Sequence, residues 1–455
     1  MAVHRIKKGL DIPITGAPEQ VVDQGAAPTR VAVVASDFVG MKPRLRVDVG
    51  DQVKRGQPLF DDRKREGVVH TAPAAGVVVA VNRGKRRAFQ SIVIELTEAE
   101  RAGRPGDDEL QDFASYTGAP VSEVSAEQVR DLLLESGAWT AFRTRPYGRV
   151  PNAGDTPKSI FVTASDTNPL SARPDVVLED RQEDFQRGLD AIAKLADVHL
   201  CQHESAAVAG DNVSQHTFAG PHPAGNVGTH IHLLDPVWRE KTVWHLGYQD
   251  VAAIGELIAT GVVAVSRVVA LGGPQVDKPR LLSTRLGASV DELVAGELKD
   301  GENRVISGSI LSGTIAMGEI FGYLGRYANQ VSVLREGRSR NFLGWLTPGL
   351  NVFSTMPTFL SGALPSSRLY DITTAENGGK RAMVPIGRYE EVFPLDILPT
   401  FLLRSILSGD LERAEALGVL ELAEEDLALC TVVCPNKHDF GPVLRTVLNT
   451  IEAEG

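Results

Sequence analysis

Cysteine is scarce in this chain of 455 residues, which holds only Cys201, Cys430 and Cys434. Three cysteines cannot form a disulfide framework, so the sequence favours a reducing compartment. The last two also fit the end of the bacterial ferredoxin pattern C-x2-C-x2-C-x3-C-P, whose first two positions here hold Glu424 and Leu427. A leucine cannot bind iron. The motif therefore indicates a ferredoxin-like segment that has lost its cluster.

Long uncharged apolar runs are missing as well. The longest apolar stretch covers residues 251–271 and is interrupted by Glu256, Gly261 and Arg267, so it falls short of the roughly 18 uncharged residues that suggest a membrane-spanning helix. Residues 1–10 include basic side chains but no apolar core, which argues against a signal peptide. The sequence predicts a chain that is soluble or bound at a membrane surface.

Positive charge is in deficit, with a formal net charge of −11 and a pI near 5.5. Nucleic acid is therefore not expected as a partner, because phosphate binding requires clustered lysine and arginine. The motifs of self-contained enzymes are missing too, since the sequence has no P-loop, no H-E-x-x-H and no convincing nucleophile–base pair. We assign no catalytic residue and no metal site to this chain.

What is present predicts a multi-domain protein of mixed α/β and α+β class. Residues 1–100 alternate apolar and polar residues around glycine turns, a pattern that resembles a barrel-sandwich domain of the biotinyl or lipoyl type. Lys64, near the tip of its central hairpin, lacks the D-K-A context of a lipoyl lysine. We interpret Lys64 as a solvated loop charge.

Residues 101–258 alternate predicted helices and strands, which indicates a Rossmann-like layer in the broad sense. Ser125 and Gln128 predict a capping box at the start of a helix. Residues 159–164 and 197–201 predict buried strands, with a helix over residues 185–195 between them. A further helix is predicted over residues 248–260, with Gly261 after its end. No G-x-G-x-x-G follows any of these strands, so the sequence announces no dinucleotide site.

The remaining chain divides into a β-rich part, residues 259–375, and a helical part, residues 376–455. Apolar runs at 267–271 and 330–334 predict strands of the β-rich part. Helical spacing of apolar residues recurs at 399–407, 410–417 and 441–453.

Histidines and cysteines recur at short spacings that raise the question of a metal. His199, Cys201 and His203 fall on one face of a predicted strand, and we expect His230 and His232 to share a strand face in the same way. Hydrogen-bonded histidines are the favoured interpretation of both sets. Cys430, Cys434 and His438 recur every four residues, but they lack an obvious fourth ligand, so buried structural thiols are the favoured interpretation.

Several motifs spread along the whole chain resemble one family, the A subunit of the sodium-translocating NADH:quinone oxidoreductase. They are residues 6–14, 71–76, 139–146, 164–169, 220–225, 325–327, 385–387 and 430–435. That family is related to the C subunit of the Rnf complex and to the flavin-carrying subunit of respiratory complex I. The resemblance implies a barrel-sandwich domain, a Rossmann-like domain, a ubiquitin-like β-grasp domain and a helical C-terminal domain.

The stretch 137–146 departs from the relatives, in which a glycine-rich loop cradles a flavin phosphate. Here bulky side chains occupy that stretch, so the flavin site is expected to be filled. The candidate quinone contacts are Trp139, Phe142, Arg143, Arg145 and Tyr147, with Arg149 nearby. A quinone head requires aromatic or apolar walls and one or two donors. The alternative stays open: the arginines pair with carboxylates across a domain boundary while the rings fill the former flavin space.

The resemblance implies a peripheral subunit on the cytoplasmic face of a bacterial inner membrane, in a respiratory sodium pump that oxidises NADH and reduces ubiquinone. Its expected partners are integral-membrane and flavin-bearing sister subunits, which are expected to hold FMN, FAD and iron–sulfur centres. This chain is expected to bind no redox cofactor tightly, and ubiquinone is its candidate ligand. The rival hypothesis is a purely architectural subunit without any ligand.

Overall fold

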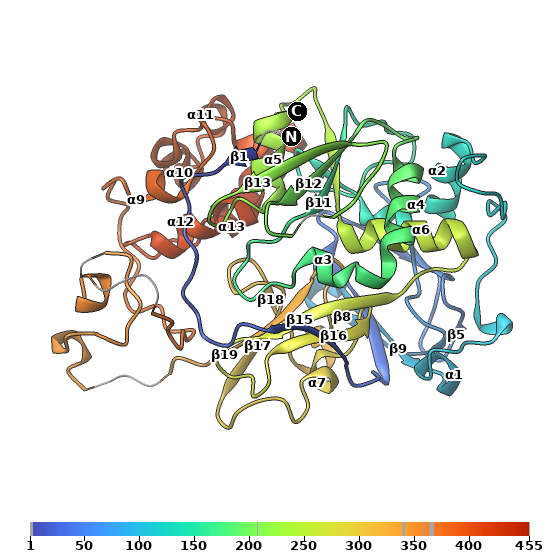
Figure 1. Ribbon diagram of the computed structural model, residues 1–455, viewed down its shortest axis with the longest axis horizontal. Helices are drawn as coiled ribbons and strands as arrows, with labels where there is room; N and C mark the ends of the chain where they lie inside the picture. Colours follow the sequence, from blue (N-terminus) through green and yellow to red (C-terminus); the bar gives the residue numbers. More distant parts are fainter. Residues whose placement is uncertain (1–2, 207, 339–341, 357, 364–367, 455) are drawn as a thin grey trace.

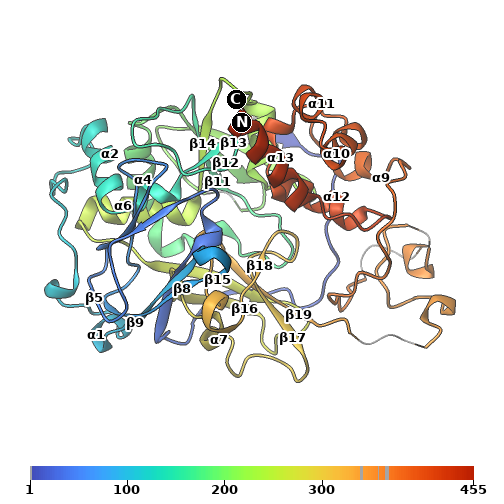
Figure 2. The same ribbon diagram turned by 180° about the vertical axis from the view of Figure 1, so that it is seen from behind.

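The computed structural model describes residues 3–206, 208–338, 342–356, 358–363 and 368–454 (Figure 1). Its strands form two six-stranded sheets, one four-stranded sheet and one three-stranded sheet. The two ends of the chain lie close together, beside the C-terminal helices, when seen from the front and from behind (Figures 1 and 2). Within the described ranges, no helix is long and apolar enough to cross a membrane.

The two smaller sheets pack against each other near the start of the chain. The four-stranded sheet has the order β3 (Arg30–Val34), β9 (Phe89–Leu96), β8 (Gly76–Arg83) and β5 (Gln52–Val53). The three-stranded sheet has the order β4 (Pro43–Leu45), β6 (Pro58–Asp62) and β7 (Val69–Thr71). Val31, Phe60 and Ile92 are buried between them. Lys64 is exposed in the turn between β6 and β7.

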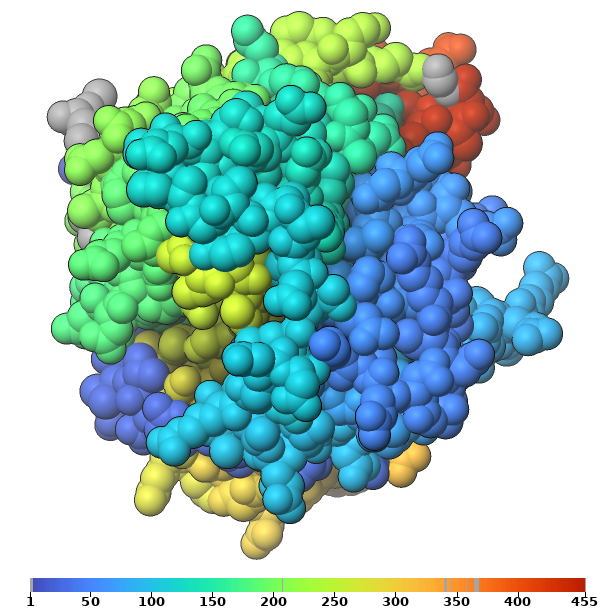
Figure 3. Space-filling model, turned by 90° about the vertical axis from the view of Figure 1, so that its right-hand side faces the viewer, coloured from blue at the N-terminus to red at the C-terminus, as the bar shows by residue number. Residues whose placement is uncertain are grey.

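Two strands from the range 1–100 lie in other sheets. β1 (Val3–Arg5) pairs in parallel with β13, and β2 (Glu19–Gln24) pairs in parallel with β16. The N-terminal segment therefore contributes one strand to each large sheet before the chain enters the two smaller ones. After β9 and α1 (Glu98–Arg101), the cyan segment around residues 100–130 runs over the surface towards the green part of the chain (Figure 3).

The first large sheet has the order β1, β13 (Ser214–Ala219), β12 (Val198–His203), β11 (Ile160–Ala164), β14 (Val243–Gly247) and β10 (Arg143–Arg145). All neighbours are parallel except β10 and β14. Because side chains alternate along a strand, Ile160 and Val162 face one side and Phe161 the other. Both faces are covered, which suits a largely parallel sheet.

Helices α4 (Gln182–Ile192) and α6 (Tyr248–Thr260) cover one face of this sheet, and α5 (Val227–Leu234) covers the other. The predicted helix 248–260 is confirmed, with Gly261 in the left-handed region at φ 72°. The capping box of α2 (Ala126–Glu135) is confirmed as well, since the Gln128 N–H donates to Ser125 Oγ at 3.2 Å and the Ser125 N–H donates to Gln128 Oε1 at 2.8 Å. The short helix α3 (Pro174–Val177) precedes α4.

The prediction that His230 and His232 lie on a strand is wrong. Both residues lie on α5, where Val227 and Ile231 occur at helical spacing and pack against the sheet. Residues two apart on a helix point to nearly opposite sides. His230 is accordingly buried against Phe218, whereas His232 bonds to Glu421 at 2.8 Å. His199, Cys201 and His203 do lie on β12.

The β-rich part of the chain forms the second large sheet. Its order is β18 (Thr314–Ile315), β17 (Asn303–Ser307), β19 (Gln330–Arg335), β15 (Ser266–Gly272), β16 (Arg280–Arg285) and β2. The short helices α7 (Val290–Leu293) and α8 (Gly318–Phe321) lie in its connections. Val269, Leu282 and Val331 belong to its buried core.

Helices dominate the last part of the chain, as the apolar spacing predicts. They are α9 (Arg388–Val392), α10 (Pro399–Ser408), α11 (Leu411–Ala416), α12 (Ala428–Val433) and α13 (Phe440–Glu454). Cys430 and Cys434 are fully buried in their common core, together with Leu427. The Tyr389 hydroxyl lies 3.2 Å from Cys434 Sγ, and Glu424 pairs with Arg445 at 2.6 Å. Burial is the main cause that raises the pKa of the Cys430 thiol.

Candidate functional site

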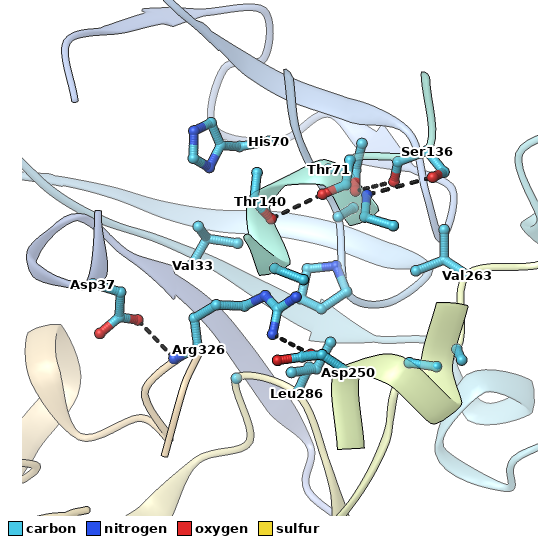
Figure 4. A pocket seen from close by; sticks show the side chains of 18 of the residues that line it. Val33, Asp37, His70, Thr71, Ser136, Thr140, Asp250, Val263, Leu286 and Arg326 are labelled. Carbon is cyan, nitrogen blue, oxygen red and sulfur yellow. Dashed lines mark hydrogen bonds and ion pairs between the residues drawn. The ribbon is translucent and has the colours of Figure 1, made fainter. Parts of the chain in front are cut away.

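An apolar pocket lies where the small sheets, α6 and the β-rich sheet meet (Figure 4). Its volume is about 90 Å³. Val33 and His70 come from the small sheets, Leu257 from α6 and Leu286 from the turn after β16. A further contribution comes from residues 136–138 and 140–141, which overlap the start of the stretch 137–146.

Backbone geometry holds residues 136–141 against the small sheets. Gly137 has φ 76°, and a Cβ atom there would lie 2.5 Å from the Thr71 hydroxyl, so only glycine fits this close approach. The Thr71 hydroxyl donates to the Ser136 carbonyl at 2.9 Å, and the Thr140 hydroxyl donates to the Gly137 carbonyl at 2.8 Å. The turn is therefore fixed from both sides.

A cluster of two arginines and two carboxylates closes one end of the pocket. Figure 4 shows Arg326 between Asp37 and Asp250. Its guanidinium bonds to Asp250 at 2.7 Å, and its backbone N–H donates to Asp37 at 2.9 Å; Arg267 also pairs with Asp250. Burial opposes ionisation of Asp250, yet Arg326 and Arg267 hold the pKa of that carboxyl below its usual value. Burial raises the pKa of Asp37 to about 6.

His70 supplies a buried polar group to the same pocket. Its ring stacks on Phe60 at 4.5 Å and meets the edge of Phe38 at 4.3 Å, measured between ring centres. Burial lowers the pKa of His70 to about 4, so the imidazole is neutral at physiological pH. Among the described residues, Nδ1 of His70 has no hydrogen-bond partner. The lining of the apolar pocket thus includes a neutral imidazole with one unpartnered nitrogen.

A second, polar cleft adjoins the pocket and has a volume of about 280 Å³. It opens at the carboxyl ends of β11 and β14, and its lining includes Ser165, Tyr248 and Arg143. Asp37, Asp250, Arg267 and Arg326 line both cavities. The arginine–carboxylate cluster is therefore the wall between an apolar and a polar compartment.

The aromatic residues of the predicted quinone strip lie in the core. Trp139 and Phe142 are fully buried, with ring centres 5.4 Å apart, and both pack on Trp244. The indole N–H of Trp139 donates to the Pro151 carbonyl at 3.0 Å. Neither ring lines the apolar pocket or the polar cleft.

The charged residues of the strip separate. Arg145 is buried and bonds to Asp426 at 2.8 Å and Glu425 at 3.0 Å. Arg149 likewise pairs with Glu452 on α13 at 3.0 Å, and Tyr147 packs against the helical core. These contacts of Arg145 and Arg149 with the C-terminal helical part are called the seam below. The remaining member, Arg143, lies over the Tyr327 ring at 4.4 Å and lines the polar cleft.

The sequence did not single out His70 or Arg326. The only local signals were indirect, because His70 precedes the 71–76 motif and Arg326 is part of the 325–327 motif. Each motif was noted for its resemblance to a family and not for its chemistry. The structure gives both motifs a position on the same pocket.

Three family models match the chain. They are described as the NqrA N-terminal barrel-sandwich hybrid domain, on residues 4–97, the NqrA second alpha/beta domain, on residues 124–263, and the NQRA C-terminal domain, on residues 268–318. A crystal structure of an NAD⁺-reducing [NiFe]-hydrogenase in the air-oxidized state covers 55% of this chain and 59% of its own, at 15% identity and a TM-score of 0.33. A likeness of that size carries no argument.

Curated relatives match from end to end. The A subunit of Na(+)-translocating NADH-quinone reductase from Cellvibrio japonicus is 54% identical over 99% of this chain and 100% of the relative. The proteins of the same name from Histophilus somni (strain 2336) and Neisseria gonorrhoeae are each 52% identical over 99% of this chain and at least 99% of the relative.

Together, the sheets and the matches define a class, a component of an oxidoreductase complex with an N-terminal barrel-sandwich domain, a second α/β domain and a C-terminal domain. The chain belongs to the family of the A subunit of Na(+)-translocating NADH-quinone reductase.

Proposed function

We propose that this chain is a peripheral subunit of a complex that couples NADH oxidation and quinone reduction to sodium transport, and that it contacts the quinone in the apolar pocket. The relatives' names supply the reaction. The pocket supplies apolar walls and few polar groups, as a quinone head requires. The observation that carries the proposal is His70, a lining residue of that pocket whose buried Nδ1 has no partner among the described residues.

His70 acts as a neutral donor or acceptor in this proposal. Its depressed pKa keeps the ring uncharged, so one ring nitrogen can donate an N–H to a quinone carbonyl while the other accepts a hydrogen bond. Arg326, already bound to Asp250, supplies positive potential from the far end of the pocket. Of the strip, Arg143 is the residue that reaches an open cavity, so we retain it as a candidate contact for the part of a ligand that extends into the polar cleft.

Titration of a short-chain ubiquinone into the purified full chain tests the proposal. We expect saturable binding that His70→Phe weakens at least tenfold at pH 7, because the phenyl ring preserves the stacking on Phe60 and removes the nitrogen. His199→Phe, in a half-buried histidine outside the pocket, is the matched control and should bind normally. Equal affinity of the His70 variant and the wild type would refute the quinone contact and favour the architectural hypothesis.

We further propose finer assignments for the domains: a lipoyl-like barrel over residues 1–100, a Rossmann-like domain over 101–258, a ubiquitin-like β-grasp domain over 259–375 and a helical domain over 376–455. β1 and β2 support an amendment, in which residues 3–24 serve as a strap across the two large sheets. Proteolytic cleavage between β1 and β2 should weaken the association of the two large sheets and lower the free energy of unfolding.

The complex implied by the family provides the partners in this proposal. Integral-membrane and flavin-bearing sister subunits hold the FMN, FAD and iron–sulfur centres, and this chain docks to them on the cytoplasmic face of the bacterial inner membrane without a tightly bound redox cofactor. The buried thiols and the Glu424–Arg445 pair at the former cluster positions support the last point. Release of the chain from membranes by high-salt or chaotropic washing, together with the flavin and iron content of the purified chain, tests this arrangement.

A further inference from the structure

Apart from Arg143 and the Arg326–Asp250 pair, no residue of the polar cleft has a role in the proposed quinone contact, and the place of the cleft in the fold suggests a ligand of its own. The chain leaves β11 for β12 on one side, and β14 enters the sheet on the other side. The carboxyl ends of β11 and β14 therefore border a topological switch point. Open α/β sheets bind ligands in the crevice outside such a point.

Buried hydroxyls in this cleft lack a partner among the described residues. Ser165 is 4% exposed and Tyr248 is 1% exposed, and the hydroxyls of both, with that of Thr163, make no hydrogen bond within the part of the chain that the structure describes. All three residues line the cleft. Leaving a buried hydroxyl unpaired is unfavourable, so three in one cavity call for a partner from outside the chain, either water or the polar groups of a ligand.

The charges around the cleft favour an anion at one end. Arg143 forms no ion pair among the described residues, and its Nε has no partner there. The 13-residue helix α6 begins at the same place, and no described side chain caps its N-terminus. A Cβ atom at its N-cap, Gly247, would meet no described atom within 4 Å, so the helix start faces open space. Helix N-termini stabilise anions.

Four carboxylates also border the cleft, and three of them are already engaged. Asp250 is bound by two arginines, Asp37 accepts the Arg326 N–H, and Glu425 pairs with Arg145. The fourth, Asp166, accepts from its neighbour Asn168. Its carboxylate can therefore accept further hydrogen bonds from hydroxyl groups of a ligand.

We propose that the polar cleft binds a phosphate ester that carries hydroxyl groups, the chemistry shared by nucleotides and sugar phosphates. The phosphate lies between Arg143 and the N-terminus of α6, with Ser165 and Thr163 donating to it. The hydroxyl groups of the ligand point to Asp166. The site does not include His70, so a His70 variant distinguishes it from the quinone contact.

Calorimetric titration of the purified full chain with adenosine 5′-monophosphate, ribose 5-phosphate and inorganic phosphate tests the proposal. We expect both esters to bind at least tenfold more tightly than inorganic phosphate. A tighter affinity for the adenosine ester identifies a nucleotide, and equal affinities identify a sugar phosphate. Either result supports the site, because the shared group is the same.

Variants locate the binding. Arg143→Leu and Ser165→Ala should each weaken ester binding at least tenfold, whereas Arg304→Leu, an arginine on β17 that pairs with Glu336 outside the cleft, should leave it unchanged. His70→Phe should also leave ester binding unchanged, which separates this test from that of the quinone. Absence of saturable ester binding, or binding that neither cleft variant weakens, would overturn the proposal.

Discussion

Two regions of the molecule differ in how far their buried polar groups are satisfied. At the seam, Arg145 has two carboxylates and a backbone carbonyl within hydrogen-bond distance, and Arg149 has a glutamate and an asparagine; one nitrogen of each guanidinium, Arg145 Nε and Arg149 Nη1, has no partner among the described residues. In the pocket and the cleft, the His70 nitrogen and three hydroxyls have no partner among the described residues. The seam groups bind other parts of the chain, whereas an unpartnered polar group in the lining of a cavity is a candidate to bind a ligand, because a folded protein normally satisfies the polar groups that it buries.

The largest expected effect comes from breaking the seam. Arg145→Leu leaves the buried Asp426 and the partly exposed Glu425 without their cation, and the loss of one member of a buried ion pair such as Arg145–Asp426 costs about 3–5 kcal/mol. We expect a correspondingly large fall in the free energy of unfolding, measured by urea denaturation. Arg143→Leu is the control, since it breaks no ion pair with a described residue, and it should cost less than about 1 kcal/mol. An equal loss of unfolding free energy in the two variants would show that the arginines of the seam and the cleft contribute alike to stability.

A smaller effect concerns the pH dependence of stability at His70. The ordinary pKa of histidine is 6.5, and burial lowers the pKa of His70 to about 4 in the folded chain. Between these values the unfolded chain binds a proton that the folded chain does not, so stability falls as the pH falls. A difference of about 2.5 units corresponds to about 3 kcal/mol, lost progressively between about pH 7 and pH 4.

His70→Phe removes this contribution while preserving the ring stacking. The stability of the variant relative to the wild type should therefore rise by about 3 kcal/mol from pH 7 to pH 4. Denaturant unfolding of both proteins across that range measures the difference, and taking the difference cancels the other titrating groups. Parallel pH profiles would mean that a partner stabilises the protonated ring.

An element can be predicted from the sequence when the residues that determine it are close together in the chain. Helix α6 was predicted with its bounds because Gly261 marks its end, and α2 because Ser125 and Gln128 bond across a single turn. The two-residue spacing of His230 and His232 is also typical of a strand. The helix is distinguished by Val227 and Ile231, which occur at helical spacing and pack against the sheet.

The candidate site is harder to predict, since its residues come from distant parts of the chain. Val33, His70, Leu257 and Arg326 meet in one pocket without any shared local pattern. The strip 139–147 carried a strong local pattern of rings and arginines, yet most of its members pack in the core or at the seam. Residue type alone does not separate an arginine that awaits a ligand from one that already has a carboxylate.

The smallest expected effect is the sharpest test of the comparison. Ser165 and Ser332 are both buried serines, at 4% and 0% exposure. The Ser332 hydroxyl donates to the Gly308 carbonyl at 2.9 Å and accepts from Gln330 at 3.0 Å, whereas the Ser165 hydroxyl has no partner in the described ranges. Removing the Ser332 hydroxyl takes one hydrogen-bond partner from the Gly308 carbonyl and one from the Gln330 amide. Removing the Ser165 hydroxyl takes none from any described group. Ser332→Ala should therefore cost about 1–3 kcal/mol, and Ser165→Ala about zero in the absence of ligand. Thermal unfolding of both variants measures this difference, and a loss at Ser165 as large as that at Ser332 would show that the Ser165 hydroxyl is already satisfied in the folded chain.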